Sequence, residues 1–267
     1  MKTTTVHGLL EGLNEFAPFS LAEKWDNVGL MIGHPEAQVC KVLLGLDPCL
    51  SLFAEAVEIG ADTIITHHPL LFHPLKKIDL ATVEGRLISF AITNALTIIA
   101  CHTNFDQISG GVSNLLAQEL GIVDGGPLQA KNCESECGFG WIGDVATPMA
   151  GDAFLQMVAE KLDQPTLLVA GRVPDEICRI AVCGGSCGDF AVSAQNQGAD
   201  IFITSEIKHS LARWAEDAGM CLVDGGHFST ENKTMVGLQH YISESIGLAD
   251  VRLSTTQDRP LRGYLEL

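Results

Sequence analysis

Residues 41–68 read KVLLGLDPCLSLFAEAVEIGADTIITHH, and this stretch decides the fold class. An apolar strand candidate at residues 39–46 precedes a helix candidate at residues 51–59, and a short apolar strand candidate follows at residues 63–66. Strand, helix and strand at this spacing are typical of a βαβ unit with parallel strands. Because the alternation continues to residue 246, the sequence predicts an α/β fold with mixed sheets flanked by helices.

A similar stretch occurs a second time in the chain. Residues 179–206 align with residues 41–68 without a gap, and both copies contain Gly-Ala-Asp-x-x-Ile-Thr. We therefore predict two similar lobes that arose by internal duplication, although α/β proteins can also reuse such turns by chance. The identical pairs include Cys49/Cys187, Gly60/Gly198, Ala61/Ala199, Asp62/Asp200, Ile65/Ile203 and Thr66/Thr204.

A change of composition near the middle of the chain suggests where the lobes meet. After a helix candidate at residues 112–120, the pattern loosens into Gly125-Gly126-Pro127 and a polar stretch. We expect a first α/β lobe over residues 1–124 and a second over residues 125–267. The last helix and the C-terminal strand of the second lobe are able to pack back on the first.

The composition restricts the partners. The chain has 33 acidic and 16 basic residues, a formal net charge of -17, and 46% hydrophobic residues, which argues against disorder. Such a negative field disfavours nucleic acid and anionic membranes, and it suits a protein that holds cations. The first residues form an amphipathic pattern rather than a secretory signal, so we expect a cytoplasmic protein with reduced thiols.

The nine cysteines include two C-x3-C pairs, Cys133/Cys137 and Cys183/Cys187. The second pair lies in a Gly-Gly turn after a strand candidate, where a tight turn is favoured over an anion-binding loop. We favour reduced, partly buried cysteines over a structural zinc site, because the spacing and the surrounding strands do not match zinc knuckles. The sequence leaves the role of these four residues open.

Three strand candidates end in residues of the kind that bind metals. In open α/β sheets, ligands bind beyond the carboxyl ends of the strands. Imidazole and carboxylate side chains gathered there form a mixed nitrogen and oxygen donor set, which suits a divalent ion. The residues at the three strand ends are His67, His68, His102, Asp106, His227 and Glu231.

The spacing of these residues favours two ions over one. His67 and His68 are adjacent, and a turn before Pro69 lets both reach neighbouring ions. His227 and Glu231 are four residues apart, so they share a face if a helix begins there. Ser229 and Thr230 are the expected N-caps of that helix. We therefore expect a dinuclear centre, which can activate water and polarise a substrate oxygen.

At these residues the sequence resembles the Nif-three-like family, whose members are often labelled "GTP cyclohydrolase 1 type 2 homolog". The resemblance implies an α/β fold of two similar lobes, a dinuclear metal site between the lobes, and a ring-shaped homohexamer. The matching segments are WDNVGL at residues 25–30, THHPL at 66–70, HTNFD at 102–106 and GGHFSTE at 225–231.

Carried over residue by residue, the family's metal ligands fall on five positions, and Asp106 becomes the bridging carboxylate. Phe105 replaces the aliphatic residue that the family usually has before that aspartate. His102 is expected beside the ligands, either as a proton donor or as a residue that supports a ligand. Asp26 and Asn27 are expected to line the pocket, while Trp25 is equally suited to packing in the core. The implied ligands are His67, His68, Asp106, His227 and Glu231.

The leading functional hypothesis is a metal-dependent hydrolase that acts on a nucleotide or a similar small molecule. Opening of the imidazole ring of GTP is one such reaction. The alternative is a non-enzymatic metal chaperone, store or regulatory scaffold, which predicts metal binding without turnover. Nucleic-acid binding is disfavoured by the charge. Two divalent ions per subunit are expected, and iron, zinc, manganese, nickel and magnesium all remain open.

Overall fold

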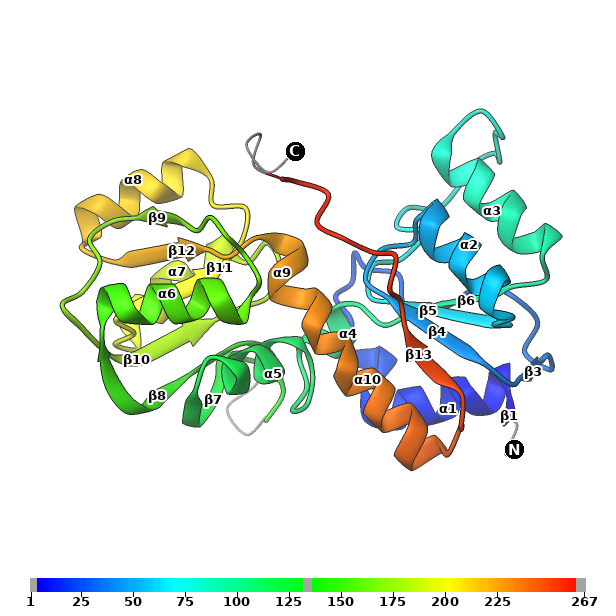
Figure 1. Cartoon of the computed structure of the whole chain (residues 1–267), viewed down its shortest axis with the longest axis horizontal. Coiled ribbons are helices and arrows are strands. Elements are labelled where there is room, and N and C mark those ends of the chain that lie inside the picture. The colour runs from blue at the N-terminus through cyan, green and yellow to red at the C-terminus, as the bar shows by residue number, and fades with distance from the viewer. Residues whose placement is uncertain (1–3, 132–135, 263–267) are drawn as a thin grey trace. The chain divides into compact units, whose positions relative to one another are not determined.

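The computed structural model describes residues 4–131 and 136–262. The chain forms two compact units, each with its own sheet and helices (Figure 1). Unit 1 comprises Met1–Phe105 and Met235–Asp258, and unit 2 comprises Asp106–Thr234 and Arg259–Leu267. The units therefore divide elsewhere than at the expected boundary between residues 124 and 125. That point lies inside a long edge strand, where Pro127 is tolerated because an edge strand needs fewer backbone donors.

Unit 1 contains a mixed sheet of five strands. Three of its strands follow one another along the chain as parallel neighbours, and β13 adds a fourth parallel strand. Only β2, at one edge, runs antiparallel to its neighbour. The order across the sheet is β13 (Val251–Leu253), β4 (Val42–Gly45), β5 (Thr63–Thr66), β6 (Thr97–Ala100) and β2 (Gly29–Ile32).

Helices cover both faces of this sheet. Leu43, Ile64 and Ile98 pack against α2 (Leu50–Ile59) and α3 (Val83–Thr93). The alternate side chains of the same strands are also buried, and α1 and α10 lie on that face (Figure 1). The helices on this second face are α1 (Val6–Phe16) and α10 (Met235–Tyr241). Their Phe16 and Tyr241 rings stack with centroids 4.2 Å apart.

Unit 2 contains a mixed sheet of six strands. The three central strands β10, β11 and β12 are parallel, whereas the strands at both edges are antiparallel. The order across the sheet is β7 (Ile122–Ala130), β8 (Gly138–Ala150), β10 (Glu176–Val182), β11 (Ile201–Thr204), β12 (Cys221–Asp224) and β9 (Leu168–Ala170).

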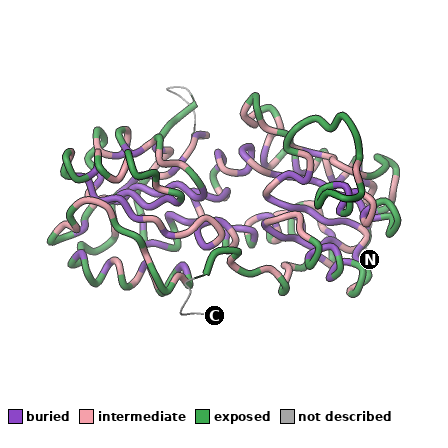
Figure 2. The backbone as a smooth tube through the Cα atoms, turned by 90° about the horizontal axis from the view of Figure 1, so that it is seen from above, coloured by how far each residue is buried: buried purple, intermediate pink, exposed green. Residues whose placement is uncertain are grey.

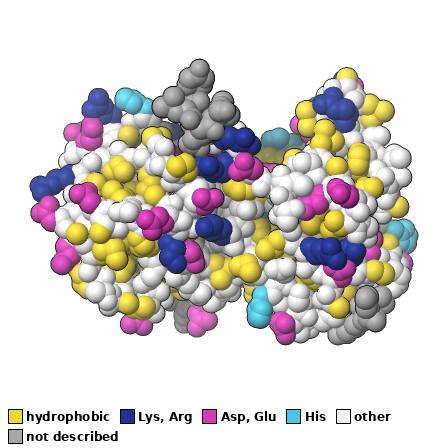
Figure 3. Space-filling view, viewed as in Figure 1, with side chains coloured by type: hydrophobic (Ala, Val, Ile, Leu, Met, Phe, Trp, Pro, Cys, Tyr) yellow, Lys and Arg dark blue, Asp and Glu magenta, His cyan; other side chains and the backbone are white. Residues whose placement is uncertain are grey.

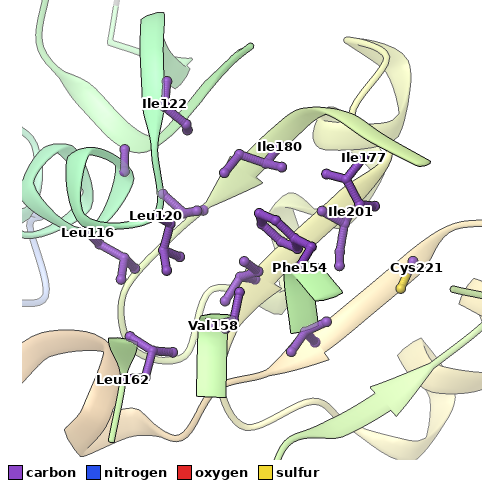
Figure 4. Packing of buried hydrophobic residues seen from close by; sticks show 14 residues of the cluster. Leu116, Leu120, Ile122, Phe154, Val158, Leu162, Ile177, Ile180, Ile201 and Cys221 are labelled. Atoms are coloured by element: carbon purple, nitrogen blue, oxygen red, sulfur yellow. The ribbon is translucent and has the colours of Figure 1, made fainter. Parts of the chain in front are cut away.

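Alternate residues of these strands pack into two clusters. On one side, Ile180 and Ile201 pack against α5 and α6, and Phe154 of α6 belongs to the same cluster (Figure 4). Phe202 and Leu222 face α7 and α8 on the other side. Figure 2 shows the buried segments running through the interior of each unit. The four helices are α5 (Val112–Glu119), α6 (Gly151–Lys161), α7 (Ala191–Asn196) and α8 (His209–Ala218).

These sheets and helices confirm the predicted α/β class. The helix expected over residues 231–246 begins earlier, at His227, and changes its hydrogen-bonding pattern along its length. Among the described residues, no helix is long and apolar enough to cross a membrane. The short elements are β1 (Thr4–Thr5), β3 (Gln38–Val39), η1 (Phe19–Leu21), α4 (Thr103–Asp106), η2 (Gly188–Phe190), α9 (His227–Glu231), η3 (Asn232–Thr234) and η4 (Ile242–Ile246).

The two aligned segments share a local structure. The Asp62 carboxylate accepts hydrogen bonds from the backbone N–H groups of Cys40 and Lys41, at 2.8 and 3.1 Å. In the second segment, the Asp200 carboxylate accepts from the N–H groups at residues 178 and 179, both at 2.8 Å. A duplication predicts such shared geometry, but the duplication itself stays a prediction.

Candidate metal centre

Three histidines of unit 1 follow two neighbouring parallel strands. His67 and His68 come directly after β5, and His102 comes two residues after β6. Because parallel strands end at the same edge of a sheet, their carboxyl ends bring these side chains together. One ring nitrogen from each histidine lies within 4.8 Å of the others, so the three residues could hold a metal ion. His102, which was expected beside the ligands, thus belongs to the same group.

An oxygen atom orients the ring of His67. Its Nδ1 lies 2.9 Å from the carbonyl oxygen of Cys101, which can only accept a hydrogen bond. Nδ1 therefore carries the proton, and the lone pair of the neutral ring is on Nε2. Since His67 is fully buried, the ring is held in one orientation, which defines Nε2 as the nitrogen that could bind a metal.

His68 and His102 are oriented by carboxylates. His68 Nδ1 lies 2.7 Å from Asp47 Oδ1, and His102 Nδ1 lies 2.7 Å from Asp26 Oδ1. Burial raises the pKa of Asp26, but hydrogen bonds from His102 and Thr103 outweigh it and lower the pKa to about 2. Asp26 is therefore ionised near neutral pH, and it holds the Nδ1 proton of His102. Carboxylate-to-histidine pairs of this kind are typical around bound metals.

The WDN segment supports the histidine group in three different ways. The Asp26 carboxylate orients the His102 ring. The side-chain amide of Asn27 donates to the carbonyl of Leu71, which fixes the loop that follows the histidines. Trp25 is 57% exposed, so it does not pack in the core. Its ring and that of Phe72 lie 6.1 and 6.4 Å from the ring of His102, so two exposed aromatic rings border this group.

Unit 2 carries a second group of ligand-type residues. His227 is the first residue of α9, and its Nε2 lies 3.1 Å from Glu231 Oε2. This confirms that the two residues share one helical face. Glu206 Oε1 accepts a 2.8 Å hydrogen bond from His227 Nδ1, so a carboxylate orients this ring as well. The imidazole and the buried Glu231 carboxylate form a mixed nitrogen and oxygen donor pair.

The expected N-caps of this helix were wrong. The cap residue is Gly226, whose φ of 80° is in the left-handed region. Thr230 lies inside the helix, where its hydroxyl hydrogen-bonds to the carbonyls of Gly226 and His227, both at 3.0 Å. Ser229 donates its hydroxyl to the side chain of Gln164. Neither hydroxyl is therefore used to cap the helix.

Asp106 ends α4 and begins unit 2. The pKa of the Cys187 thiol is raised well above its usual range. The causes are a hydrogen bond with Cys183, burial, and the nearby charges of Cys183, Asp106 and Glu231. The two carboxylates therefore lie near the same thiol, which stays protonated and is a poor metal ligand. Of the other C-x3-C pair, Cys133 lies outside the described residues.

The loop after β10 makes room for Glu231, a feature that sequence reasoning missed. Gly185 has a φ of 71°, and a Cβ atom there would lie 2.2 Å from Glu231 Oε1. The loop's amides bond within the unit: the Gly185 N–H donates to Thr230 Oγ1, and the Cys187 N–H donates to Thr204 Oγ1. The loop is thus a tight turn against Glu231, a candidate ligand. The signal was the paired glycines directly after a strand.

The donor chemistry of both groups fits divalent metal ions. Each imidazole is fixed through Nδ1 by an oxygen atom, and Nε2 is then the ring nitrogen that could bind a metal. Glu231 adds a buried carboxylate in unit 2. That the two groups form one dinuclear centre, with Asp106 as a bridge, stays a prediction.

Comparisons with known proteins identify relatives that match most of the chain. A protein of Clostridium perfringens named "GTP cyclohydrolase 1 type 2 homolog" is 32% identical over 246 residues, or 92% of this chain and 93% of that protein. A protein of the same name from Clostridium acetobutylicum is 33% identical over 233 residues, covering 86% of this chain and 87% of that protein.

Solved structures of related proteins also match this chain. The crystal structure of Staphylococcus aureus protein SA1388 matches with a TM-score of 0.90 at 29% identity, covering 97% of this chain and 99% of that chain. Reduced HcgD from Methanocaldococcus jannaschii matches with a TM-score of 0.79 at 25% identity, covering 95% and 98%. The family model described as Duf34/NIF3 (NGG1p interacting factor 3) matches residues 4–260, and the chain therefore belongs to this family.

Proposed function

We propose that this protein is a dinuclear metal-dependent hydrolase that acts on a nucleotide or a similar small molecule. One observation carries the proposal: four histidines at strand ends each have Nδ1 held by an oxygen atom. Such oxygen partners are typical of histidines that bind metals, and in this proposal three of the four histidines are ligands while His102 handles protons. The names of the relatives support a nucleotide as the substrate.

In this proposal, five residues hold two divalent ions. Histidine nitrogens and carboxylate oxygens accept iron, zinc, manganese, nickel or magnesium, so metal identity is left to measurement. Bound ions would supply Lewis-acid polarisation of a substrate oxygen and of water. The five residues are His67, His68, Asp106, His227 and Glu231.

His102 and Asp26 carry the proton chemistry in this proposal. Asp26 is ionised and accepts the Nδ1 proton of His102, so the His102 Nε2 can take a proton from a reacting group. The imidazolium formed in this way is stabilised by the adjacent carboxylate, and it can return the proton to a leaving group. The Asp26 side chain is fully buried and that of His102 is 14% exposed, so the ion pair itself is largely shielded from solvent.

The charge of the chain sets a requirement for such a substrate. Asp and Glu side chains are spread over both units on the face in Figure 3, rather than gathered in one patch. With a net charge of -17, the protein repels a polyanion at long range. A nucleotide must therefore arrive with a cation or meet a local positive group near the site.

The test combines metal analysis with a turnover screen. Protein purified without added metal is assayed by elemental analysis and then with GTP and other nucleotides, beside His67→Ala and Glu231→Ala variants. We expect metal-dependent turnover in the wild type, and at least about a 100-fold loss in each variant. Equal activity in all three proteins contradicts the catalytic assignment. Saturable metal binding without any turnover instead favours the chaperone, store or scaffold alternative.

Self-association into a hexameric ring is part of the same proposal. Several large apolar side chains of unit 1 are exposed between residues 78 and 92, among them Ile78, Leu80 and Ile92. Where exposed apolar side chains of this kind form one surface, that surface is typical of an interface. Light scattering on the purified protein measures the assembly, and a monomer at micromolar concentration contradicts it.

A further inference from the structure

Unit 2 contains a cavity of about 350 Å³ that His227 helps to line. This volume is within the range of small-molecule sites, which start near roughly 300 Å³. Phe228 and Leu168 contribute apolar walls, and Arg259 and Arg262 contribute two guanidinium groups. The cavity thus joins a candidate metal ligand to apolar walls and positive charge.

The arginines are notable because basic residues are scarce in this chain. Only 16 of its residues are Lys or Arg, against 33 Asp and Glu, yet two of the 16 line this one cavity. Arg259 Nη1 donates to Gln164 Oε1 at 3.3 Å, and Ser229 Oγ donates to the same oxygen at 3.2 Å. Gln164 therefore links the Arg259 side chain to the helix that begins with His227.

Two carboxylates also line the cavity, but both accept hydrogen bonds from neighbouring residues of the protein. Glu206 accepts the hydrogen bond from His227 Nδ1. Asp224 accepts from the backbone N–H groups of Gly226 and Ile207, at 3.0 and 3.1 Å. These bonds use carboxylate oxygens within the wall, whereas the guanidinium groups are donors only, with a geometry that suits phosphate oxygens.

We infer that this cavity binds the phosphate-bearing end of the substrate, with Arg259 and Arg262 as the phosphate ligands and the apolar walls against the rest of the molecule. The inference rests on the proposed function and narrows its substrate class to phosphorylated small molecules. It also supplies the local positive group that a chain of net charge -17 requires for an anionic substrate. His227 then lies at the edge of the same cavity, within reach of the bound molecule.

Calorimetry on the full chain tests this inference, with guanosine monophosphate and guanosine as a matched pair of probes. The variants are Arg259→Ala, Arg262→Ala and the double substitution, and Arg172→Ala is the control. Arg172 is a largely exposed arginine that pairs with Asp175 outside the cavity. Each protein is measured as purified and after metal removal, and thermal unfolding verifies that each is folded.

We expect the wild type to bind the monophosphate at least about tenfold more tightly than guanosine, because charge-assisted bonds are worth roughly twice neutral ones. The double variant should lose that preference with and without metal, while Arg172→Ala keeps it. Equal monophosphate affinity in the wild type and the double variant overturns the inference, as does a wild type that prefers guanosine. Arginine-dependent binding without turnover supports the cavity assignment and refutes only the proposed hydrolase.

Discussion

The aligned segments 41–68 and 179–206 have the same framework and different ends. Gly60 and Gly198 end the helix region with φ values of 69° and 79°. The side chains of Lys41 and Arg179 donate to the carbonyls of residues 59 and 197 respectively. Beyond the second strand, however, the first segment continues with two histidines and the second with a serine and a glutamate. The turns are therefore the constant part, and the residues after the strands carry the chemistry.

Two aligned positions show how the ends diverge. His68 of the first segment aligns with Glu206 of the second. A candidate ligand in one unit therefore corresponds to the carboxylate that orients His227 in the other. Asp47 of the first segment aligns with Gly185 of the second. Asp47 orients His68, whereas Gly185 leaves space for Glu231. One framework thus positions a histidine group in unit 1 and a mixed histidine and carboxylate group in unit 2.

The largest expected effect comes from substituting matched positions after the two strands. His67→Ala should lose at least one metal equivalent and about 100-fold or more in turnover, because a buried nitrogen ligand is removed. Ser205→Ala, at the aligned position, should keep its metal content. Elemental analysis of the two variants measures the difference, and equal metal content in both contradicts the assignment of His67.

A smaller effect is expected from glycine substitutions in unit 2. Gly185→Ala would place a methyl group against the Glu231 carboxylate and strain a left-handed residue. Metal affinity should fall by about 10-fold to 100-fold, as for other displaced ligand supports. Gly198→Ala has open space around it, so it should cost only about 1–2 kcal/mol of stability. Metal titration and thermal unfolding separate the two results, and equal metal affinity in both variants contradicts the contact.

The Asp26 carboxylate predicts a pH dependence of stability in unit 1. Its pKa is lower in the folded protein, about 2, than the ordinary 3.8, so it stabilises the fold above about pH 4. That stability is lost as the pH falls through about 2. Asp26→Asn should therefore be about 1–2 kcal/mol less stable than the wild type at pH 7, and the difference should shrink toward pH 2. Denaturant unfolding at several pH values measures it, and a constant difference contradicts the ionised pair.

The smallest expected effect is one that should be equal in the two segments. Asp62→Ala and Asp200→Ala each remove an acceptor from two backbone N–H groups near the surface. Each variant should lose about 1 kcal/mol, because water can replace part of the lost bonding. Neither should change its metal content. A large difference between the two melting temperatures shows that the shared turn does not contribute equally in both units.

Much of the fold could be predicted from the sequence because local patterns specify it. The strands expected at residues 63–66 and 201–204 have those bounds in the structure, since each is a short, fully buried apolar run. The hairpin of β7 and β8 was missed, because Gly125-Gly126-Pro127 reads as a break in a sequence and is tolerated at a sheet edge. Which strand lies at an edge depends on tertiary pairing, which the local pattern does not contain.

The sequence could suggest the candidate ligands, which stay a prediction, but it could not reveal the residues that orient them. The spacing of His227 and Glu231 required only one turn of helix, so it could be recognised directly. Asp47 and Glu206, by contrast, each lie 21 residues from the histidine that they orient. Their roles follow from strand ends that meet in space, and no local spacing reveals such a pairing. Phe72 beside His102 was missed for the same reason.

The most direct test is the metal content of the wild-type chain, purified without added metal and measured by elemental analysis against protein concentration. A dinuclear centre predicts close to two divalent ions per chain, with at least one lost in His67→Ala. A wild-type content near zero, unchanged after incubation with iron, zinc, manganese, nickel or magnesium, contradicts the metal centre.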